Sequence, residues 1–197
     1  MQIVLASQSP SRLMILRQAG VEPVIHPAHV DEDAIIAQLD GADPDEIVTR
    51  LALAKAQAIA PEHPGDVVIG GDSMLLLDGQ LQGKPHTPEA TIERWRQQRG
   101  RTAHLITAHA NFLAERPVVE ASRTTIHFAD ASDADIEAYA RSGEPLQCAG
   151  AFTLEALGGW FIDAIEGDPS SVIGLSLPVV RRALYSFGLN ASDFWTE

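Results

Sequence analysis

The chain has 197 residues, of which 45% are hydrophobic, and it carries a formal net charge of −13. This length supports one sizeable hydrophobic core, and no apolar run approaches the ~20 residues that span a membrane. The acidic balance argues against a polymeric nucleic-acid partner, which needs clustered Lys and Arg, but not against a nucleotide held by a few basic residues in one cleft.

The first predicted elements are a strand over residues 2–6 and a helix with Pro10 in its first turn. The loop and the first helical turn carry Ser7, Ser9, Ser11 and Arg12. Free N–H groups at a helix start favour phosphate, and an arginine adds a bidentate cationic group. The segment thus indicates a phosphate site, although serines that only cap the helix and a solvated Arg12 explain it equally well.

From residue 31 to residue 81 the pattern predicts two helices, a buried strand and a hairpin, at residues 31–41, 43–60, 66–70 and 74–81. Asp43 caps the second helix. The buried strand ends at Gly70-Gly71-Asp72, and the hairpin turns at Asp78-Gly79.

The rest of the chain predicts a helix, two strands, a helix, a strand and a last helix, at residues 88–98, 102–113, 117–128, 132–142, 158–165 and 177–188. The two longer strands flank a turn at residues 115–117, and Ser132 caps the helix that follows them. Because strands and helices alternate throughout, we expect an α/β fold with a mixed sheet in a single domain over residues 1–197.

Four groups along the chain share a compatible chemistry. Asp72 follows a predicted strand, Lys84 lies in a Gly-Lys-Pro loop, Lys55 lies in an aliphatic helix, and Glu32 belongs to an acidic cluster before a helix. Lysines can neutralise a triphosphate, while carboxylates can hold Mg²⁺ or Mn²⁺ and polarise a water. Each group also has an ordinary structural explanation, as a solvated lysine, a turn or a complement to the helix dipole.

The amino-acid sequences of six motifs and their order along the chain resemble those of one known family. LASQSPSR, VDED, LALAKAQA, GGDSMLLLDGQLQGKPHTPEAT, SGEPLQCAGAF and IEGDPSSVIGLSLP are similar to the successive signature blocks of the Maf family, from residue 3 to about residue 188. That family consists of nucleoside triphosphate pyrophosphatases, some of them described as septum-formation inhibitors. The resemblance implies a mixed, twisted sheet in two lobes around a central cleft, and hydrolysis of an α–β phosphoanhydride.

The resemblance also implies roles for single residues. Asp72 would be the proton acceptor or a metal ligand, and Glu32 a metal ligand or a group that orients water. The phosphates would be contacted by Ser9, Arg12, Lys55 and Lys84. The cofactor would be a divalent cation, Mg²⁺, Mn²⁺ or Co²⁺.

The segment around Glu155 resembles the branch of the family that acts on 7-methyl-GTP. A carboxylate can accept both N1–H and the exocyclic amine of guanine, and it suits the positive charge of 7-methylguanine. Ser11 and Ser73 match positions tied to substrate choice, but neither is the residue expected there. The implied partner is a nucleoside triphosphate, with neither polymeric nucleic acid nor membrane, and a homodimer is compatible with the sequence.

Two alternatives stay open. One is a dTTP/UTP-type pyrophosphatase, which differs chiefly at Glu155, where that branch carries glutamine. The other is a non-catalytic regulator of septum formation that only binds nucleotide, although such a sensor needs no carboxylate to activate water.

The remaining sequence features concern signals and motifs that we do not find. The chain opens without the basic and apolar regions of a secretory signal, and its one cysteine, Cys148, cannot form an internal disulfide, so we expect a cytoplasmic location. We interpret Cys148 as a packed thiol, because no histidine lies near it in sequence. The seven histidines lack the spacing of metal ligands, so we assign none to a zinc site.

Overall fold

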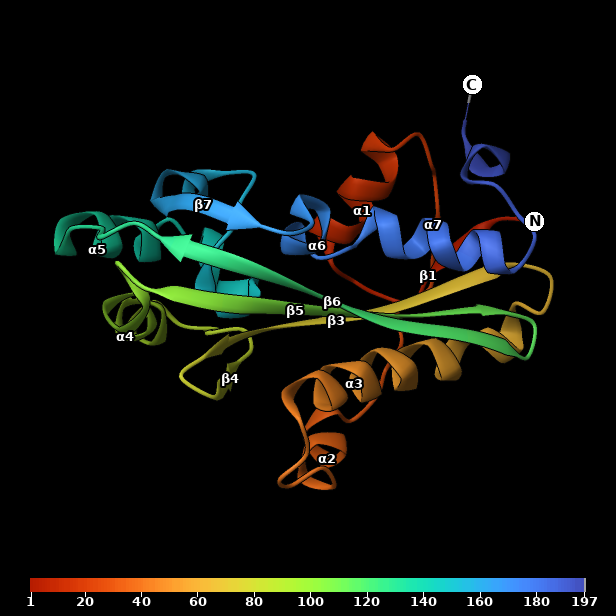
Figure 1. The fold of residues 1–197 in the computed structure, drawn as a ribbon, viewed down its shortest axis with the longest axis horizontal. Coiled ribbons are helices and arrows are strands. Elements are labelled where there is room, and N and C mark those ends of the chain that lie inside the picture. Colours follow the sequence, from red (N-terminus) through yellow and green to blue (C-terminus); the bar gives the residue numbers. More distant parts are fainter. Residues whose placement is uncertain (197) are drawn as a thin grey trace. The chain divides into compact units, whose positions relative to one another are not determined.

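The computed structural model describes residues 1–196. Its strands form a seven-stranded sheet in the order β2-β1-β3-β5-β6-β7, with β4 paired to β3 (Figure 1). The sheet is mixed, since β1 pairs in parallel with β2 and β3 whereas β6 pairs antiparallel with β7. The α/β class expected from the alternation of strands and helices is therefore confirmed. No helix among residues 1–196 is long and apolar enough to cross a bilayer.

The chain divides into two compact units that are interleaved along the sequence. The first unit comprises Met1–Asp72, Thr107–Ser122 and the residues from Gly174 onward, and the second comprises Ser73–Ile106 and Arg123–Ile173. Three strands contribute residues to both units: β3 (Val67–Leu77), β5 (Thr102–Leu113) and β6 (Arg116–Phe128).

The first unit contains two short strands and most of the longer helices. Its elements are β1 (Ile3–Leu5), α1 (Pro10–Gln18), β2 (Val24–Ile25), α2 (Glu32–Ala37), α3 (Pro44–Ile59), the 3-10 turn η1 (Ala60–Glu62), α7 (Leu177–Ser186) and the 3-10 turn η5 (Ala191–Phe194). Helix α3 covers one face of this part of the sheet, and α1 and α7 cover the other (Figure 1).

Alternation along the strands explains both layers of the first unit. Successive side chains of a strand point to opposite faces, so Val4 and Val68 meet Ala56 and Ile59 of α3 in one apolar cluster. On the other face, Ile3 lines an apolar cavity of about 300 Å³ together with residues of α1 and α7.

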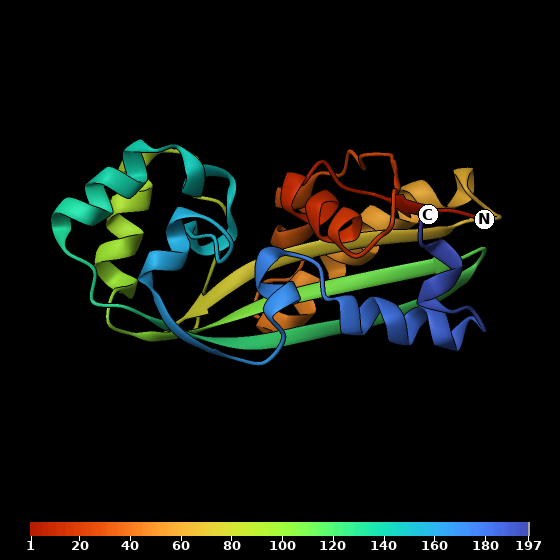
Figure 2. The same cartoon turned by 90° about the horizontal axis from the view of Figure 1, so that it is seen from above.

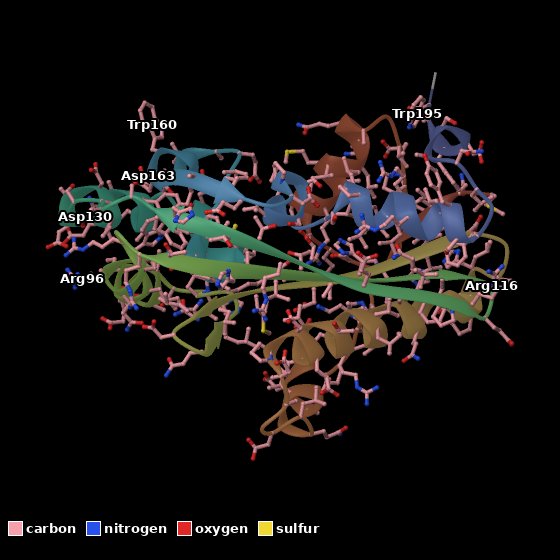
Figure 3. All side chains as sticks on the ribbon, viewed as in Figure 1. Arg96, Arg116, Asp130, Trp160, Asp163 and Trp195 are labelled. Atoms are coloured by element: carbon pink, nitrogen blue, oxygen red, sulfur yellow. The ribbon has the colours of Figure 1, made fainter. Side chains whose placement is uncertain are left out.

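The second unit is built around a buried tryptophan. Its elements are β4 (Gln80–Gln82), α4 (Pro88–Gln98), α5 (Asp133–Arg141), the 3-10 turns η2 (Glu144–Gln147), η3 (Ala149–Ala151) and η4 (Leu157–Phe161), β7 (Ile162–Glu166) and α6 (Pro169–Ile173). Helices α4 and α5 lie side by side (Figure 2). Trp95 of α4 is fully buried, packs edge-on against Phe128, Tyr139 and Phe161, and donates Nε1–H to the Ala151 carbonyl at 2.7 Å. Trp160 of η4, in contrast, points outward and is 83% exposed (Figure 3).

Helix caps and the hairpin turn, which depend only on neighbouring residues, agree with the sequence analysis. Asp43 and Ser132 cap α3 and α5 with their side chains, as predicted, and Ser9 caps α1, which is the capping alternative left open for the serines of that loop. The hairpin of β3 and β4 pairs Leu77 with Gln80, and its turn Asp78-Gly79 has φ values of 51° and 77°, as a two-residue I′ turn requires.

Four predicted boundaries are wrong. Strand β3 does not end at Gly71 but continues to Leu77, so Asp72 lies inside a strand. Residues 158–161 form the turn η4 rather than a strand, because the N–H groups of Leu157 and Gly158 bond to the Glu144 carboxylate. Helix α2 ends at Ala37 instead of residue 41. The turn between β5 and β6 falls at residues 114–115, since β6 already begins at Arg116.

Helix α3 approaches the sheet closely at Gly70. A Cβ added there would lie 2.5 Å from the Ala52 carbonyl oxygen and 2.6 Å from the Ala56 nitrogen, both backbone atoms of α3. We expect Gly70→Ala to lower the free energy of unfolding by roughly 1–3 kcal/mol, because the helix must move away from the strand. Denaturant unfolding would measure this loss.

Gly65→Ala is the matched control, since a Cβ there meets nothing within 4 Å. It should change the unfolding free energy by only a few tenths of a kcal/mol. Equal unfolding midpoints for the two variants would contradict the close approach at Gly70.

Candidate active site

Lys55 and Asp72 form a buried ion pair in the first unit. Lys55 Nζ of α3 donates to Asp72 Oδ1 of β3 at 2.6 Å and lies 2.9 Å from Glu32 Oε1. Lys55 is only 9% exposed and Asp72 only 7%. The structure thus brings together three of the residues to which the sequence analysis assigned catalysis, and one ammonium group links two carboxylates.

The two glycines before Asp72 make this arrangement possible. Gly70 admits the backbone of α3, which carries Lys55, and on the opposite face of the strand a Cβ at Gly71 would lie 3.3 Å from Arg12 Nε. Side chains at both positions would displace the helix and the guanidinium. The glycines therefore act inside a strand and not, as predicted, by ending one.

Arg12 is a second buried cation of the same unit. Its Nε donates to the Gly174 carbonyl at 2.8 Å and its Nη1 to Ser7 Oγ at 3.1 Å, and the residue is 9% exposed. Ser7 and Gly174 therefore hold the guanidinium in place. Arg12 does not extend into solvent, which removes the solvated alternative.

Burial is the main influence on the ionisation of Asp72 and Arg12. It raises the pKa of Asp72 above the ordinary aspartate range, although the charges of Lys55 and Arg12 oppose that shift. Burial likewise lowers the pKa of Arg12, against the charges of Asp72 and Glu32. Asp72 Oδ2 is buried and has no hydrogen-bond partner within residues 1–196. A carboxylate with a raised pKa and an unused oxygen is chemically suited to accept a proton.

The predicted phosphate serines lie at the start of α1. Ser9 is the N-cap, and its hydroxyl accepts the Arg12 N–H at 3.4 Å. Ser11 follows in the first turn and is partly buried. Capping thus describes part of what Ser9 does, and contact of either serine with phosphate stays a prediction.

Lys84, the other predicted lysine, lies in the second unit on a loop whose backbone is held by hydrogen bonds. The Gly83 carbonyl accepts Arg94 Nη1 at 2.5 Å and the Gly150 N–H at 3.2 Å, and His86 N–H bonds to the Leu146 carbonyl at 3.0 Å. Lys84 lies between these fixed points and is exposed. The loop backbone is therefore restrained while the ammonium group faces solvent.

Glu155 lies on another loop of the second unit, and its charge and that of Lys84 both act on Cys148. The charge of Glu144 acts on Cys148 as well. Burial first, and then the two glutamates, raise the pKa of Cys148 to about 11, so its thiol is protonated at neutral pH and suits the predicted packing role. Ser73 follows Asp72 in β3 and is partly buried.

Two residues that the sequence analysis did not select prove important for the geometry. Gly174 supplies the carbonyl that holds Arg12, and Glu144 binds the loop that carries Glu155. Both lie inside the motif blocks quoted above, but nothing in their local pattern distinguishes a backbone acceptor or an anchoring carboxylate.

Comparison with known proteins agrees with the motifs. The nucleoside triphosphate pyrophosphatase of Corynebacterium efficiens is 95% identical over the full length of both chains, and that of Corynebacterium aurimucosum is 77% identical, again over both full lengths. Among solved structures, the Staphylococcus aureus Ham1 protein aligns with a TM-score of 0.43 and 19% identity, over 66% of this chain and 73% of that one. The family model of the Maf-like proteins matches residues 2–187, and this chain therefore belongs to the Maf family.

Proposed function

We propose that this chain is a nucleoside triphosphate pyrophosphatase that hydrolyses the α–β phosphoanhydride of 7-methyl-GTP or a related modified nucleotide. The products are the nucleoside monophosphate and pyrophosphate. Membership of the Maf family and the names of its relatives support the reaction. The observation that carries the proposal is the buried Asp72, held by Lys55 through one carboxylate oxygen and without a hydrogen-bond partner among residues 1–196 at the other.

Asp72 would either accept the proton of the attacking water or hold the cation that makes this water acidic, and both roles would use the same carboxylate oxygen. Lys55 fixes the carboxylate through Oδ1, which leaves Oδ2 as the basic atom. Because burial raises the pKa of Asp72, the carboxylate holds a proton more strongly than an exposed aspartate does. The resulting hydroxide character of the water favours attack on phosphorus.

Positive charge would stabilise the departing pyrophosphate. Phosphoryl transfer depends mainly on positioning and on charge held near the phosphate oxygens. Lys55 and Arg12 supply fixed, buried charge in the first unit, and Lys84 supplies an exposed ammonium group on a braced loop. We assign all three to the triphosphate rather than to the base.

A divalent cation fits the donor set of the first unit. Glu32 and Asp72 both contact the Lys55 ammonium, and Asp72 Oδ2 is an unused buried oxygen. Two carboxylates suit Mg²⁺ or Mn²⁺, which commonly take their other ligands from substrate phosphates and water. When bound, the cation would offset phosphate charge and make water more acidic. The protein's own contribution is to hold the two carboxylates beside Lys55.

Glu155 would select the base. Its carboxylate is exposed and accepts the neighbouring Leu154 N–H through Oε2 at 3.1 Å. A carboxylate can accept the two donors on the Watson–Crick edge of guanine, whereas a pyrimidine such as uracil offers one N–H between two carbonyls. This chemistry favours 7-methyl-GTP over UTP or dTTP. The cellular role would be the removal of modified nucleotides before they enter nucleic acid.

The role of Asp72 can be tested by its substitution. Asp72→Asn should lower kcat by on the order of 10²–10⁴, because the amide cannot accept the proton. Asp40→Asn, at an exposed site after α2, is the control and should keep full activity. A folded Asp72→Asn variant with kcat within about threefold of wild type would reject the role, and a wild-type protein without turnover would favour the nucleotide-binding regulator.

The pH profile gives an independent test of the same carboxylate. Asp72 must be ionised to act, so kcat/KM should fall as the pH drops through its raised pKa, with a midpoint above the ordinary aspartate value of about 3.9. Lys55→Gln should move this midpoint upward, since the ammonium charge favours the ionised form. A midpoint unchanged by Lys55→Gln would show that another group governs the acid limb.

Removal of metal should abolish pyrophosphate release. After EDTA treatment and dialysis we expect background activity only, restored by Mg²⁺, Mn²⁺ or Co²⁺. Glu32→Gln should raise the cation concentration needed for half-maximal activity. Asp33→Asn, at the adjacent exposed position, should not change it. Full activity in metal-free buffer would remove the cation from the reaction.

Substitution of Glu155 tests base selection. Glu155→Gln should lower the ratio of kcat/KM for 7-methyl-GTP to that for UTP by as much as ~10⁴, because an amide cannot accept both guanine donors. Glu137→Gln on α5 makes the same carboxylate-to-amide change away from the loop and should leave the ratio unchanged. If Glu155→Gln also leaves it unchanged, Glu155 does not read the base.

A further inference from the structure

The carboxylate of Glu144 accepts four hydrogen bonds within the second unit. Oε1 accepts the Gly158 N–H at 3.0 Å, the Tyr139 hydroxyl at 3.2 Å and the Thr153 hydroxyl. Oε2 accepts the Leu157 N–H at 3.1 Å. Two of these donors are backbone groups, so the side chain of Glu144 fixes the path of the main chain at residues 157 and 158.

These bonds close a loop at both ends. Thr153 begins the loop and Gly158 ends it, and the Tyr139 hydroxyl also accepts the Thr153 N–H at 3.1 Å. The two ends touch, since a Cβ added at Gly158 would lie 2.5 Å from both the Thr153 carbonyl oxygen and the Tyr139 hydroxyl. The segment from Thr153 to Gly158 is therefore a small closed loop with Glu144 and Tyr139 at its base.

Glu155 lies within this loop. Its carboxylate is exposed and accepts one hydrogen bond from its own neighbour, the Leu154 N–H. No other hydrogen bond or ion pair of Glu155 occurs within residues 1–196. The position of the carboxylate thus depends on the backbone of the loop, and the loop depends on Glu144.

We propose that Glu144 is a positioning residue for base selection, which holds the loop from Thr153 to Gly158 so that Glu155 presents its carboxylate to the purine. This inference rests on the proposed function, in which Glu155 reads the base. Both carboxylate oxygens of Glu144 accept hydrogen bonds within the protein, so we assign Glu144 to the loop and not to the nucleotide.

The ionisation of Glu144 agrees with this role. Burial alone would raise its pKa, but the donors from Thr153, Gly158, Leu157 and Tyr139 outweigh burial and lower the pKa below the ordinary value. The side chain is therefore a carboxylate, which accepts hydrogen bonds at both oxygens. An amide at this position would offer one acceptor oxygen and place an NH₂ group against backbone or hydroxyl donors.

The test compares substrates rather than total activity. Glu144→Gln should lower kcat/KM for 7-methyl-GTP by on the order of tenfold or more through KM, because the base contact is misplaced. For UTP, kcat/KM should stay within about twofold. Tyr139→Phe removes one donor but keeps the ring packed on Trp95, and should change the ratio in the same direction by a smaller factor. Glu137→Gln is again the matched control.

A double variant separates positioning from general damage to the fold. In Glu144→Gln/Glu155→Gln the substrate ratio should equal that of Glu155→Gln alone, because Glu144 acts through Glu155. Equal losses for both substrates, or an unchanged ratio in Glu144→Gln, would overturn the inference while leaving the proposed function intact. If Glu144→Gln does not fold, Tyr139→Phe decides in the same way. An unchanged ratio in Glu155→Gln would instead refute base reading, and the inference with it.

Discussion

Burying the carboxylate of Asp72 inside strand β3 costs free energy that only a close positive charge can offset. Lys55 supplies that charge at 2.6 Å, but only because α3 lies directly on the strand at Gly70, where a side chain would meet the helix backbone. The site of the first unit therefore depends on one helix–strand contact as much as on its charged residues. Lys55 is the reason that Asp72 can be both buried and ionised.

The summed charge of the cluster formed by Glu32, Asp72, Lys55 and Arg12 also has a consequence for phosphate binding. Glu32 and Asp72 carry two negative charges, and Lys55 and Arg12 carry two positive ones, so the charges of the four groups balance, with Glu32 as the exposed member. Such a cluster keeps Asp72 basic without attracting anions strongly. A triphosphate would need additional positive charge, which is the physical reason for assigning a divalent cation and Lys84 to the same reaction.

Features governed by local chemistry could be predicted from the sequence, and features governed by distant contacts could not. Asp43 and Ser132 cap their helices as expected, because capping needs only a side-chain oxygen and the next turn. The sequence predicts too early an end for β3, because two glycines before Asp72 resemble a turn, whereas in the structure α3 and Arg12 pack against them. The sequence predicts a strand where the turn η4 forms, because the carboxylate that folds this turn lies 13 residues away at Glu144. The family motifs assign Lys55 and Asp72 to one site, but they do not predict the ion pair between them, because the two residues lie on different elements and no local pattern joins them.

The two residues of the second unit that we propose to contact the nucleotide share one structural feature. Lys84 and Glu155 both present a charged group to solvent, while the backbone that carries each is held by a charged side chain from elsewhere in the unit. Arg94 binds the Gly83 carbonyl next to Lys84, and Glu144 binds the N–H groups that follow Glu155. Restraining the backbone lowers the entropy that a ligand contact must overcome, yet it leaves the side chains of Lys84 and Glu155 exposed. A substitution at Glu144 should therefore change which nucleotide is preferred, whereas a substitution at Arg94 should weaken all triphosphates alike.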